Sequence, residues 1–251
     1  MKFKKLIALS IIVLIVFLIY IMTIDRKIYY VSLGDSFAIG INPYGKIDYG
    51  YSDYIADYLK KSNILEFYTK SFAKNDYRTI DLIHDIEDNK ETIVNGKKKT
   101  IKNALIKADI VTISIGSNDI FYKMGINDMK YNLEKKEDIY KYIDEVIEDY
   151  NKLFSLLRQY CKEDIIIIGL YNPLSRISVI YSRNLEPGFV YANDKLKKLS
   201  KKYNAYYIDI YQIFKENPNY FPNPNDIHPN IEGYKVIANQ IIDVIENNII
   251  N

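Results

Sequence analysis

Three short polar motifs hold the residue types of a hydrolytic site. Gly34-Asp35-Ser36 offers a hydroxyl, Gly116-Ser117-Asn118-Asp119 offers a carboxamide, and Asp226-Ile227-His228-Pro229 offers an imidazole two residues after a carboxylate. An imidazole can activate a serine hydroxyl as a nucleophile, and an amide N–H₂ can stabilise a developing oxyanion. Taken singly, each motif also fits a capped turn, because Asp, Ser and Asn are common at helix N-caps and in loops.

The elements that must position these motifs alternate along the chain. The pattern predicts strands at 28–33, 65–72, 109–115, 164–170 and 205–210, and helices at about 50–62, 79–88, 98–107, 137–161, 190–202 and 231–248. Strands alternating with helices predict one α/β domain with a parallel sheet. Long irregular stretches are expected at 117–134 and 171–189. The serine and asparagine motifs each follow a predicted strand, at the sheet edge where such folds place their sites.

Composition narrows the function classes. The 251 residues carry a net charge of +2, too small to suggest nucleic-acid binding. Cys161 is the only cysteine, which excludes an intramolecular disulfide and a cysteine-based zinc site. Nothing in the sequence implies a metal or an organic cofactor. Of the two histidines, His84 lies among acidic residues in a predicted helix, and we expect it to be solvated.

Residues 1–25 are predicted to be separate from the domain at 26–251. Lys2, Lys4 and Lys5 precede the uncharged run from Leu6 to Ile24. As a helix this run would span about 28 Å, close to the hydrocarbon thickness of a bilayer. We therefore expect an N-terminal transmembrane helix that anchors the chain, with the domain extracytoplasmic. A cleaved signal, which would leave a secreted domain, and a buried helix are the alternatives.

The motifs together resemble the blocks of the GDSL-type, or SGNH, esterases and lipases, over residues 28–245. Gly34-Asp35-Ser36 resembles the nucleophile block, Gly116 to Asp119 the asparagine block, and Asp226 to Pro229 the acid–histidine block. The stretch Ile168–Pro173 is similar to a strand and loop of bacterial members. The resemblance implies a three-layer α/β/α flavodoxin-like sandwich around a five-stranded parallel sheet.

The resemblance also implies ester hydrolysis through an acyl-enzyme. Ser36 would be the nucleophile, His228 the base, and Asp226 the acid that orients the imidazole. The oxyanion hole would comprise the Ser36 N–H, the Asp76 N–H and the Asn118 side chain. The candidate substrate-binding residues are Asp35, Tyr171 and Asn172.

Two positions depart from the family pattern. Asp76 stands where the family usually has a glycine, although only its backbone N–H is needed. The family acid usually lies three residues before the histidine, where this chain has Asn225; Asp226 lies two before. Either Asp226 orients His228, or a backbone carbonyl does so and the site is a Ser–His dyad.

The sequence thus predicts a membrane-anchored esterase or lipase whose substrate is an acyl lipid or an O-acylated polysaccharide. The segment Tyr171–Phe189 is either an apolar acyl site, a lid, or an ordinary packed loop. The competing hypothesis is a catalytically silent tethered module that binds a cell-envelope ligand. A flavodoxin-like nucleotide binder is a third, disfavoured because the turn after the first strand has Gly34 and then Gly40 but no glycine-rich phosphate loop.

Overall fold

A parallel sheet forms the centre of the molecule. The computed structural model describes residues 27–125, 139–172 and 179–250. The strands of this sheet are β1 (Ile28–Gly34), β2 (Leu65–Thr69), β5 (Ile110–Ser114), β6 (Asp164–Ile168) and β7 (Tyr206–Ile208). Their order is β2-β1-β5-β6-β7, and every neighbouring pair is parallel. All five predicted strands are confirmed, and the strand order reverses between β1 and β5, where open α/β sheets bind their ligands.

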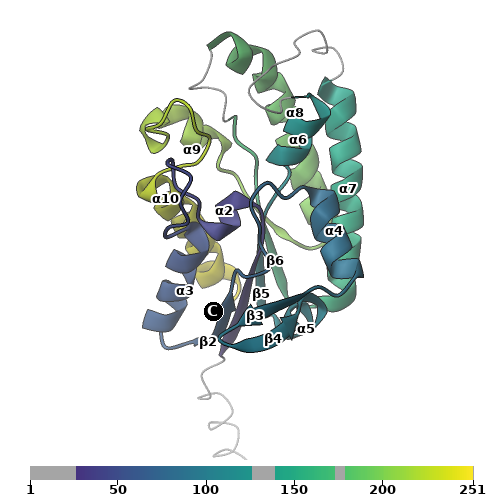
Figure 1. Cartoon of the computed structure of the whole chain (residues 1–251), viewed down its shortest axis with the longest axis vertical. Coiled ribbons are helices and arrows are strands. Elements are labelled where there is room, and N and C mark those ends of the chain that lie inside the picture. Colours follow the sequence, from purple (N-terminus) through teal and green to yellow (C-terminus); the bar gives the residue numbers. More distant parts are fainter. Residues whose placement is uncertain (1–26, 126–138, 173–178, 251) are drawn as a thin grey trace, which may run out of the picture.

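Helices cover both faces of the sheet. They are α2 (Ser36–Ile39), α3 (Tyr51–Lys61), α4 (Thr79–Glu87), α5 (Ile101–Lys107), α6 (Ser117–Lys123), α7 (Ile139–Tyr160), α8 (Val179–Lys202), α9 (Tyr211–Glu216), a 3-10 turn (Pro218–Tyr220) and α10 (Ile231–Asn248). In Figure 1, α3, α9 and α10 lie on one side of the strands, and α4, α7 and α8 lie on the other. This arrangement confirms the predicted three-layer α/β/α architecture.

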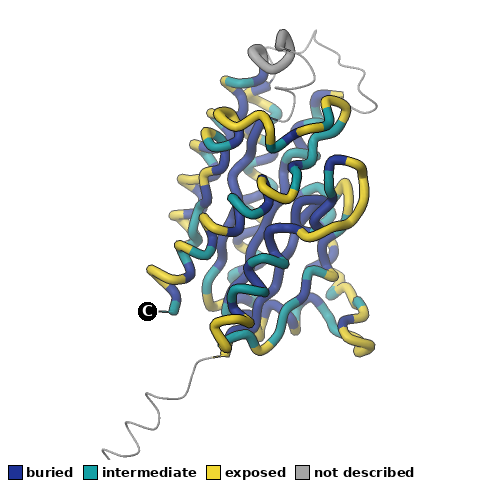
Figure 2. Tube along the Cα trace, turned by 90° about the vertical axis from the view of Figure 1, so that its left-hand side faces the viewer, coloured by how far each residue is buried: buried dark blue, intermediate teal, exposed yellow. Residues whose placement is uncertain are grey.

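The alternation of side chains along β1 shows why two helical layers are needed. Tyr29, Val31 and Leu33 join the apolar cluster formed with α4, α5, α7 and α8. Ile28 and Tyr30 join the opposite cluster, formed with α3 and α10. A strand that buries both alternating sets must lie inside the molecule. Figure 2 shows the buried segments gathered in the centre, with exposed residues at the periphery.

A small hairpin was missing from the sequence-based expectation. Strands β3 (Glu91–Val94) and β4 (Lys97–Thr100) pair antiparallel, so the predicted helix at 98–107 begins only at Ile101. The turn is Asn95-Gly96, and both residues have positive φ, 51° and 73°. Asn-Gly is the preferred sequence of the type I′ turn that closes two-residue hairpins, because that turn needs positive φ at both central positions.

Two stretches expected to be irregular are partly helical. Helix α6 occupies the start of 117–134, and α8 begins at Val179, inside 171–189. Pro187 lies within α8 and disfavours a helix by itself, yet Gly188 packs so closely on α7 that a Cβ would overlap the Ile139 side chain. Residues 126–138 and 173–178, including the apolar Leu174 and Ile177 of the proposed acyl site or lid, lie outside the described residues.

The predicted anchor at residues 1–25 also lies outside the described residues. Within the described ranges, no helix combines the length and the apolar character that crossing a bilayer requires. The described chain enters β1 at Lys27 and Ile28, at the amino-terminal edge of the sheet and at the lower end of Figure 1. The carboxyl ends of the strands, where the polar motifs lie, form the opposite edge.

Candidate active site

Ser36 begins a short helix directly after β1. Its neighbour Asp35 is the N-cap of α2, and the Asp35 carboxylate accepts a hydrogen bond from the Phe37 N–H at 3.1 Å. Ser36 is largely buried but lines a cavity. The N–H groups of the first turn of a helix have no partner within the helix. The Ser36 N–H is therefore suited to donate to an anionic oxygen beside its own hydroxyl.

Gly34 is required by the close approach of two strands. It has φ of +129°, and a Cβ at this position would overlap the Ser114 carbonyl oxygen of β5. The next residue uses the same carbonyl, because the Asp35 N–H donates to it at 2.9 Å. The glycine of the Gly-Asp-Ser motif thus permits the tight turn that presents Ser36.

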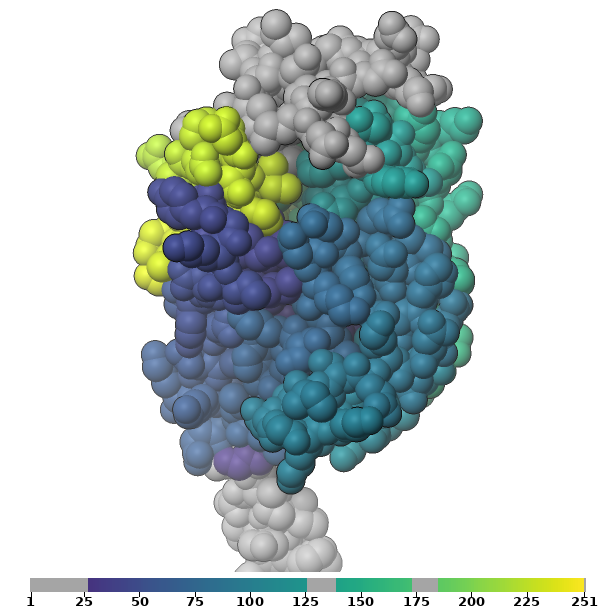
Figure 3. All heavy atoms as spheres, viewed as in Figure 1, coloured from purple at the N-terminus to yellow at the C-terminus, as the bar shows by residue number. Residues whose placement is uncertain are grey.

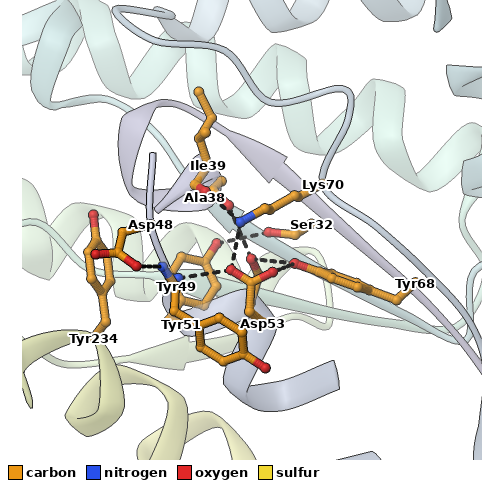
Figure 4. A network of polar contacts seen from close by, with 12 residues as sticks. Ser32, Ala38, Ile39, Asp48, Tyr49, Tyr51, Asp53, Tyr68, Lys70 and Tyr234 are labelled. Carbon is orange, nitrogen blue, oxygen red and sulfur yellow. Dashed lines mark hydrogen bonds and ion pairs between the residues drawn. The ribbon is translucent and has the colours of Figure 1, made fainter. Parts of the chain in front are cut away.

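A polar network fixes the far end of α2 (Figure 4). The Lys70 ammonium lies 2.6 Å from the Ile39 carbonyl oxygen and 2.6 Å from the Asp53 carboxylate. The Ser52 hydroxyl donates to the Ala38 carbonyl at 3.1 Å. The last carbonyls of a helix lack partners within it, so these contacts satisfy groups that would otherwise need water. Lys70 and Asp53 were not singled out from the sequence because their link to α2 exists only in three dimensions.

Asn118 is oriented by the loop that follows β2. Its Nδ2 donates to the Tyr77 carbonyl oxygen at 3.0 Å, which leaves the second Nδ2 hydrogen for another acceptor. The same loop is tied to the nucleophile strand, because the Lys74 N–H donates to the Gly34 carbonyl at 3.1 Å. The loop at 73–78 therefore connects the serine and asparagine motifs.

Asp119 is a positioning residue that sequence reasoning missed. Its carboxylate accepts from the Thr79 N–H at 2.9 Å and from the Thr79 hydroxyl at 3.1 Å, so the start of α6 is joined to the start of α4. Burial raises the pKa of Asp119 to about 6, although the Thr79 hydrogen bonds act in the opposite direction. The only feature of the sequence that could have indicated this role is the position of Asp119 directly after Asn118.

Asp76 adopts the backbone conformation that usually requires glycine. Its φ is +58°, in the left-handed region that Asp and Asn tolerate better than other non-glycine residues. Its side chain is exposed and accepts from Asn75 Nδ2 at 2.9 Å. Asp76 does not line the cavity at Ser36. The glycine-like backbone explains how an aspartate occupies this position.

His228 is held by Asp226 from two directions. One carboxylate oxygen, Asp226 Oδ1, lies 2.8 Å from His228 Nδ1 and 2.7 Å from the backbone nitrogen of His228. The histidine side chain is 12% exposed. Its Nε2 is buried and has no hydrogen-bond partner among the described residues, so the Ser36 hydroxyl is not bonded to it in this structure. Such a nitrogen is poised to accept a proton from a hydroxyl that moves within reach.

The three motifs converge at the carboxyl edge of the sheet. Ser36 and Asn118 line the same cavity, together with Ile227, the residue before His228. The Phe37 ring, next to Ser36, has its centre 6.2 Å from that of the His228 ring. His84 instead lies exposed on α4, as expected.

The three candidate substrate-binding residues differ in their surroundings. Asp35 and Tyr171 line the cavity at Ser36, whereas Asn172 lines a neighbouring cavity of about 80 Å³, which it shares with Tyr171. The Tyr171 hydroxyl donates to the Ile227 carbonyl, which supports the histidine loop. Burial raises the pKa of Asp35 to about 7, an effect that the Phe37 N–H hydrogen bond partly opposes.

Comparison with known proteins agrees with this geometry. The family model described as "GDSL-like Lipase/Acylhydrolase family" matches residues 32–236, a span that contains all three motifs. The chain belongs to this family. As the description says, the family is one of lipases and acylhydrolases, which act on esters.

Two solved structures share the fold over most of the chain, and one further protein is similar in sequence. A lipase from a goat rumen metagenome has 20% identity and a TM-score of 0.69, covering 85% of this chain and 95% of its own. An acetylxylan esterase from Geobacillus stearothermophilus has 18% identity and a TM-score of 0.61, covering 91% and 98%. The uncharacterized protein YpmR of Bacillus subtilis (strain 168) is 25% identical over 222 residues, 86% of this chain and 80% of its own.

Proposed function

We propose that this chain is a serine esterase that hydrolyses carboxylic esters through an acyl-enzyme. The observation that carries the proposal is the state of His228, whose Nδ1 is held by Asp226 at 2.8 Å while its Nε2 is buried and unpartnered. A general base needs a fixed tautomer on one nitrogen and a free lone pair on the other. Asp226 supplies the first condition, which favours a Ser–His–Asp triad over a Ser–His dyad.

The first half-reaction acylates Ser36. The Ser36 oxygen bonds to the ester carbonyl carbon as His228 Nε2 takes the hydroxyl proton, and the carbonyl electron pair moves onto its oxygen. The tetrahedral intermediate then collapses, the bond to the alcohol oxygen breaks, and His228 returns the proton to the leaving alcohol. Asp226 stabilises the imidazolium formed between these steps.

The second half-reaction restores the enzyme. A water molecule attacks the acyl carbon, and His228 Nε2 takes its proton. The bond to the Ser36 oxygen then breaks, Ser36 regains a proton from His228, and the carboxylic acid leaves. The two halves use the same base and the same oxyanion donors.

The proposed oxyanion donors are the Ser36 N–H and the second Nδ2 hydrogen of Asn118, which both line the cavity, and the Asp76 N–H, whose residue lies outside the lining. Removal of one such donor typically costs about 3–4 kcal/mol of transition-state stabilisation. A carboxylate beside a developing oxyanion would oppose it. The exposed Asp76 side chain, paired with Asn75, avoids that repulsion.

The proposal includes location and substrate class. Residues 1–25 would anchor the protein in the cell membrane with residues 26–251 extracytoplasmic, on the strength of the uncharged run Leu6–Ile24 and the lysines before it. The ester would belong to a lipid or to an O-acylated polysaccharide. The names of the similar proteins, a lipase and an acetylxylan esterase, are consistent with either class.

A fluorophosphonate probe tests the mechanism directly, because only an activated serine reacts quickly with it. We expect the full chain to be labelled and Ser36→Ala to be unlabelled. Ser117→Ala is a matched control, since Ser117 lines the same cavity, and it should label like the wild type. Labelling that survives Ser36→Ala would refute the mechanism. A complete lack of labelling in the wild type would favour the catalytically silent module.

A further inference from the structure

Lysines gather at the end of the molecule opposite Ser36. We call this surface the basic face; it comprises Lys60, Lys61, Lys97, Lys98, Lys107 and Lys201, all exposed. Four of the six lie in the last turns of α3, α5 and α8. In a parallel α/β fold these helices all return to the amino-terminal edge of the sheet, so their lysines meet there.

The hairpin β3–β4 adds lysines that helix geometry does not explain. Lysines near a helix C-terminus complement the helix dipole, but Lys97 and Lys98 lie on a strand. Lys98 pairs with Glu91 at 3.2 Å, and Glu66 is also exposed at this end. Within the described chain no ion pair involves the other five lysines of the basic face, so their charges are available to a partner.

Exposed apolar side chains accompany these charges. Ile93 on the hairpin is 59% exposed, and Ile106 on α5 is 61% exposed. Large apolar side chains interspersed with lysines are characteristic of surfaces that rest in the headgroup region of a bilayer, where the apolar groups are buried and the cations meet anionic lipids. A surface that binds soluble nucleic acid would not bury the two isoleucine side chains.

The chain emerges from this same face. Ile28 begins β1, and the Lys27 ammonium donates to the Asn63 carbonyl beside the end of α3. Figure 3 shows the start of β1 at the lower end of the molecule, between α3 and the hairpin. The 26 residues that precede Lys27 include the uncharged run Leu6–Ile24. A bilayer that holds this run lies against the basic face.

We propose that the basic face rests on the anionic phospholipid headgroups of the membrane in which residues 6–24 are anchored, and that the catalytic edge consequently points away from the bilayer. Strand β1 runs from this face to Gly34, and its seven residues span about 20 Å at roughly 3.3 Å per residue. The ester of a bilayer lipid does not reach Ser36 in this orientation. Resting on the proposed function, this assigns the enzyme to esters carried by molecules beyond the membrane surface, such as O-acylated polysaccharide.

Energy transfer from dyes on the full chain to a headgroup acceptor measures the orientation. One dye is attached at Asn103→Cys, exposed on α5 beside the basic face, and another at Tyr44→Cys, 72% exposed near the catalytic edge. Cys161 is buried and does not compete for the dye. The vesicles are phosphatidylcholine alone or phosphatidylcholine with phosphatidylglycerol. We expect several-fold higher transfer from position 103 than from position 44 on the anionic vesicles, decreasing in high salt.

A charge variant and its control test the role of the lysines. Each lysine near an anionic surface contributes about a fivefold factor, so Lys60→Gln, Lys61→Gln, Lys97→Gln and Lys98→Gln together should lower the preference for this orientation at least tenfold. The matched control removes the same charge elsewhere, with Lys46→Gln, Lys195→Gln, Lys215→Gln and Lys235→Gln, and should leave the preference intact. The proposal would be overturned if both dyes transferred energy equally, or if the dye at position 44 lay closer to the headgroups than the dye at position 103. It would also be overturned if the chain failed to associate with the vesicles, or if the first variant had no effect.

Esterase activity measured in the same vesicles tests whether the esters of bilayer lipids are kept from Ser36. We expect p-nitrophenyl acetate in solution to be hydrolysed and the acyl esters of the vesicle lipids to remain intact. Hydrolysis of the vesicle lipids at a comparable rate would overturn the outward orientation of the site. If neither ester is hydrolysed while the transfer pattern persists, the proposed function fails and the assignment of the basic face stands.

Discussion

A single carboxylate oxygen, Asp226 Oδ1, contacts both the ring nitrogen Nδ1 and the backbone nitrogen of His228, at 2.8 Å and 2.7 Å. The two-residue spacing makes this possible, because an Asx-type turn returns the carboxylate to the N–H two residues on. The carboxylate therefore shapes the loop and orients the imidazole together. An acid three residues before the histidine is not needed for this contact.

The first prediction follows from that double contact. Asp226→Ala should lower kcat by about 10³–10⁴-fold, the usual scale for losing the orienting member of a triad. Asn225→Ala provides the matched control, since Asn225 is exposed and occupies the family's usual acid position. It should change kcat less than about twofold, because nothing at that position contacts the imidazole. The opposite ranking would mean that the loop rearranges to use position 225.

The second prediction concerns the aspartate in place of glycine. Asp76→Gly should keep kcat within about threefold of wild type, because the N–H is retained and glycine adopts positive φ without strain. Asp76→Val should lower the free energy of unfolding by about 1–2 kcal/mol, since a β-branched residue is strained in that region. Steady-state kinetics and urea unfolding measure the two effects. A large gain in kcat for Asp76→Gly would show that the carboxylate does oppose the oxyanion.

The third prediction separates steric overlap from backbone strain. Gly34→Ala should prevent stable folding or cost more than about 3 kcal/mol, because its Cβ would overlap the Ser114 carbonyl. Gly45→Ala is the control: Gly45 also has positive φ, +72°, but a Cβ there meets nothing within 4 Å. It should cost only about 1 kcal/mol. Similar unfolding free energies for the two variants would contradict the close approach of β1 and β5.

The fourth prediction is a pH dependence of stability. Burial raises the pKa of Asp35 to about 7, so the folded chain binds more protons than the unfolded chain between about pH 4 and 7. This contribution is fully present below the unfolded pKa and is lost as the pH rises through the folded pKa. The free energy of unfolding should fall by up to about 1.4 kcal/mol per pH unit in that window. Asp119, with its pKa raised to about 6, contributes in the same direction.

Asp35→Asn tests which carboxyl is responsible. The amide oxygen can still accept from the Phe37 N–H, but the side chain no longer titrates. The slope of unfolding free energy against pH should therefore become shallower between pH 5 and 7 without vanishing, because Asp119 remains. Urea unfolding across this range measures it. An unchanged slope would mean that Asp35 is ionised in the folded chain at acidic pH.

Much of the fold was predictable because local and global signals agree. The run Ile165–Ile168 is apolar throughout and lies on β6, buried on both faces. The hairpin was missed because its second strand reads Lys-Lys-Lys-Thr, and its main sequence signal is the turn Asn95-Gly96. The stretch 171–189 was expected to be irregular, yet α8 runs through Pro187 and Gly188, where Gly188 packs closely on α7.

The site, too, contains residues that the sequence predicted and residues that it did not. Ser36, Asn118 and His228 were identified because each is a chemically distinctive residue in a loop after a strand or before a helix. Lys70 and Asp119 act through partners more than 30 residues away, at Ile39 and Thr79. No local pattern marks such contacts, since they depend on how the sheet brings its loops together. Positioning residues of this kind emerge only from coordinates.

Tyr171 links the shape of the cavity at Ser36 to the position of the loop that carries His228. Its ring lines the cavity at Ser36 and stacks on Phe221, while its hydroxyl holds the Ile227 carbonyl next to the histidine. A substitution at Tyr171 that reshapes the cavity would also release the loop that carries His228, the proposed base. Variants selected for a new acyl preference should therefore lose turnover at first. Restoring turnover would require further substitutions in the loop at 222–229. A change of substrate range in this chain therefore depends on the loop that carries His228.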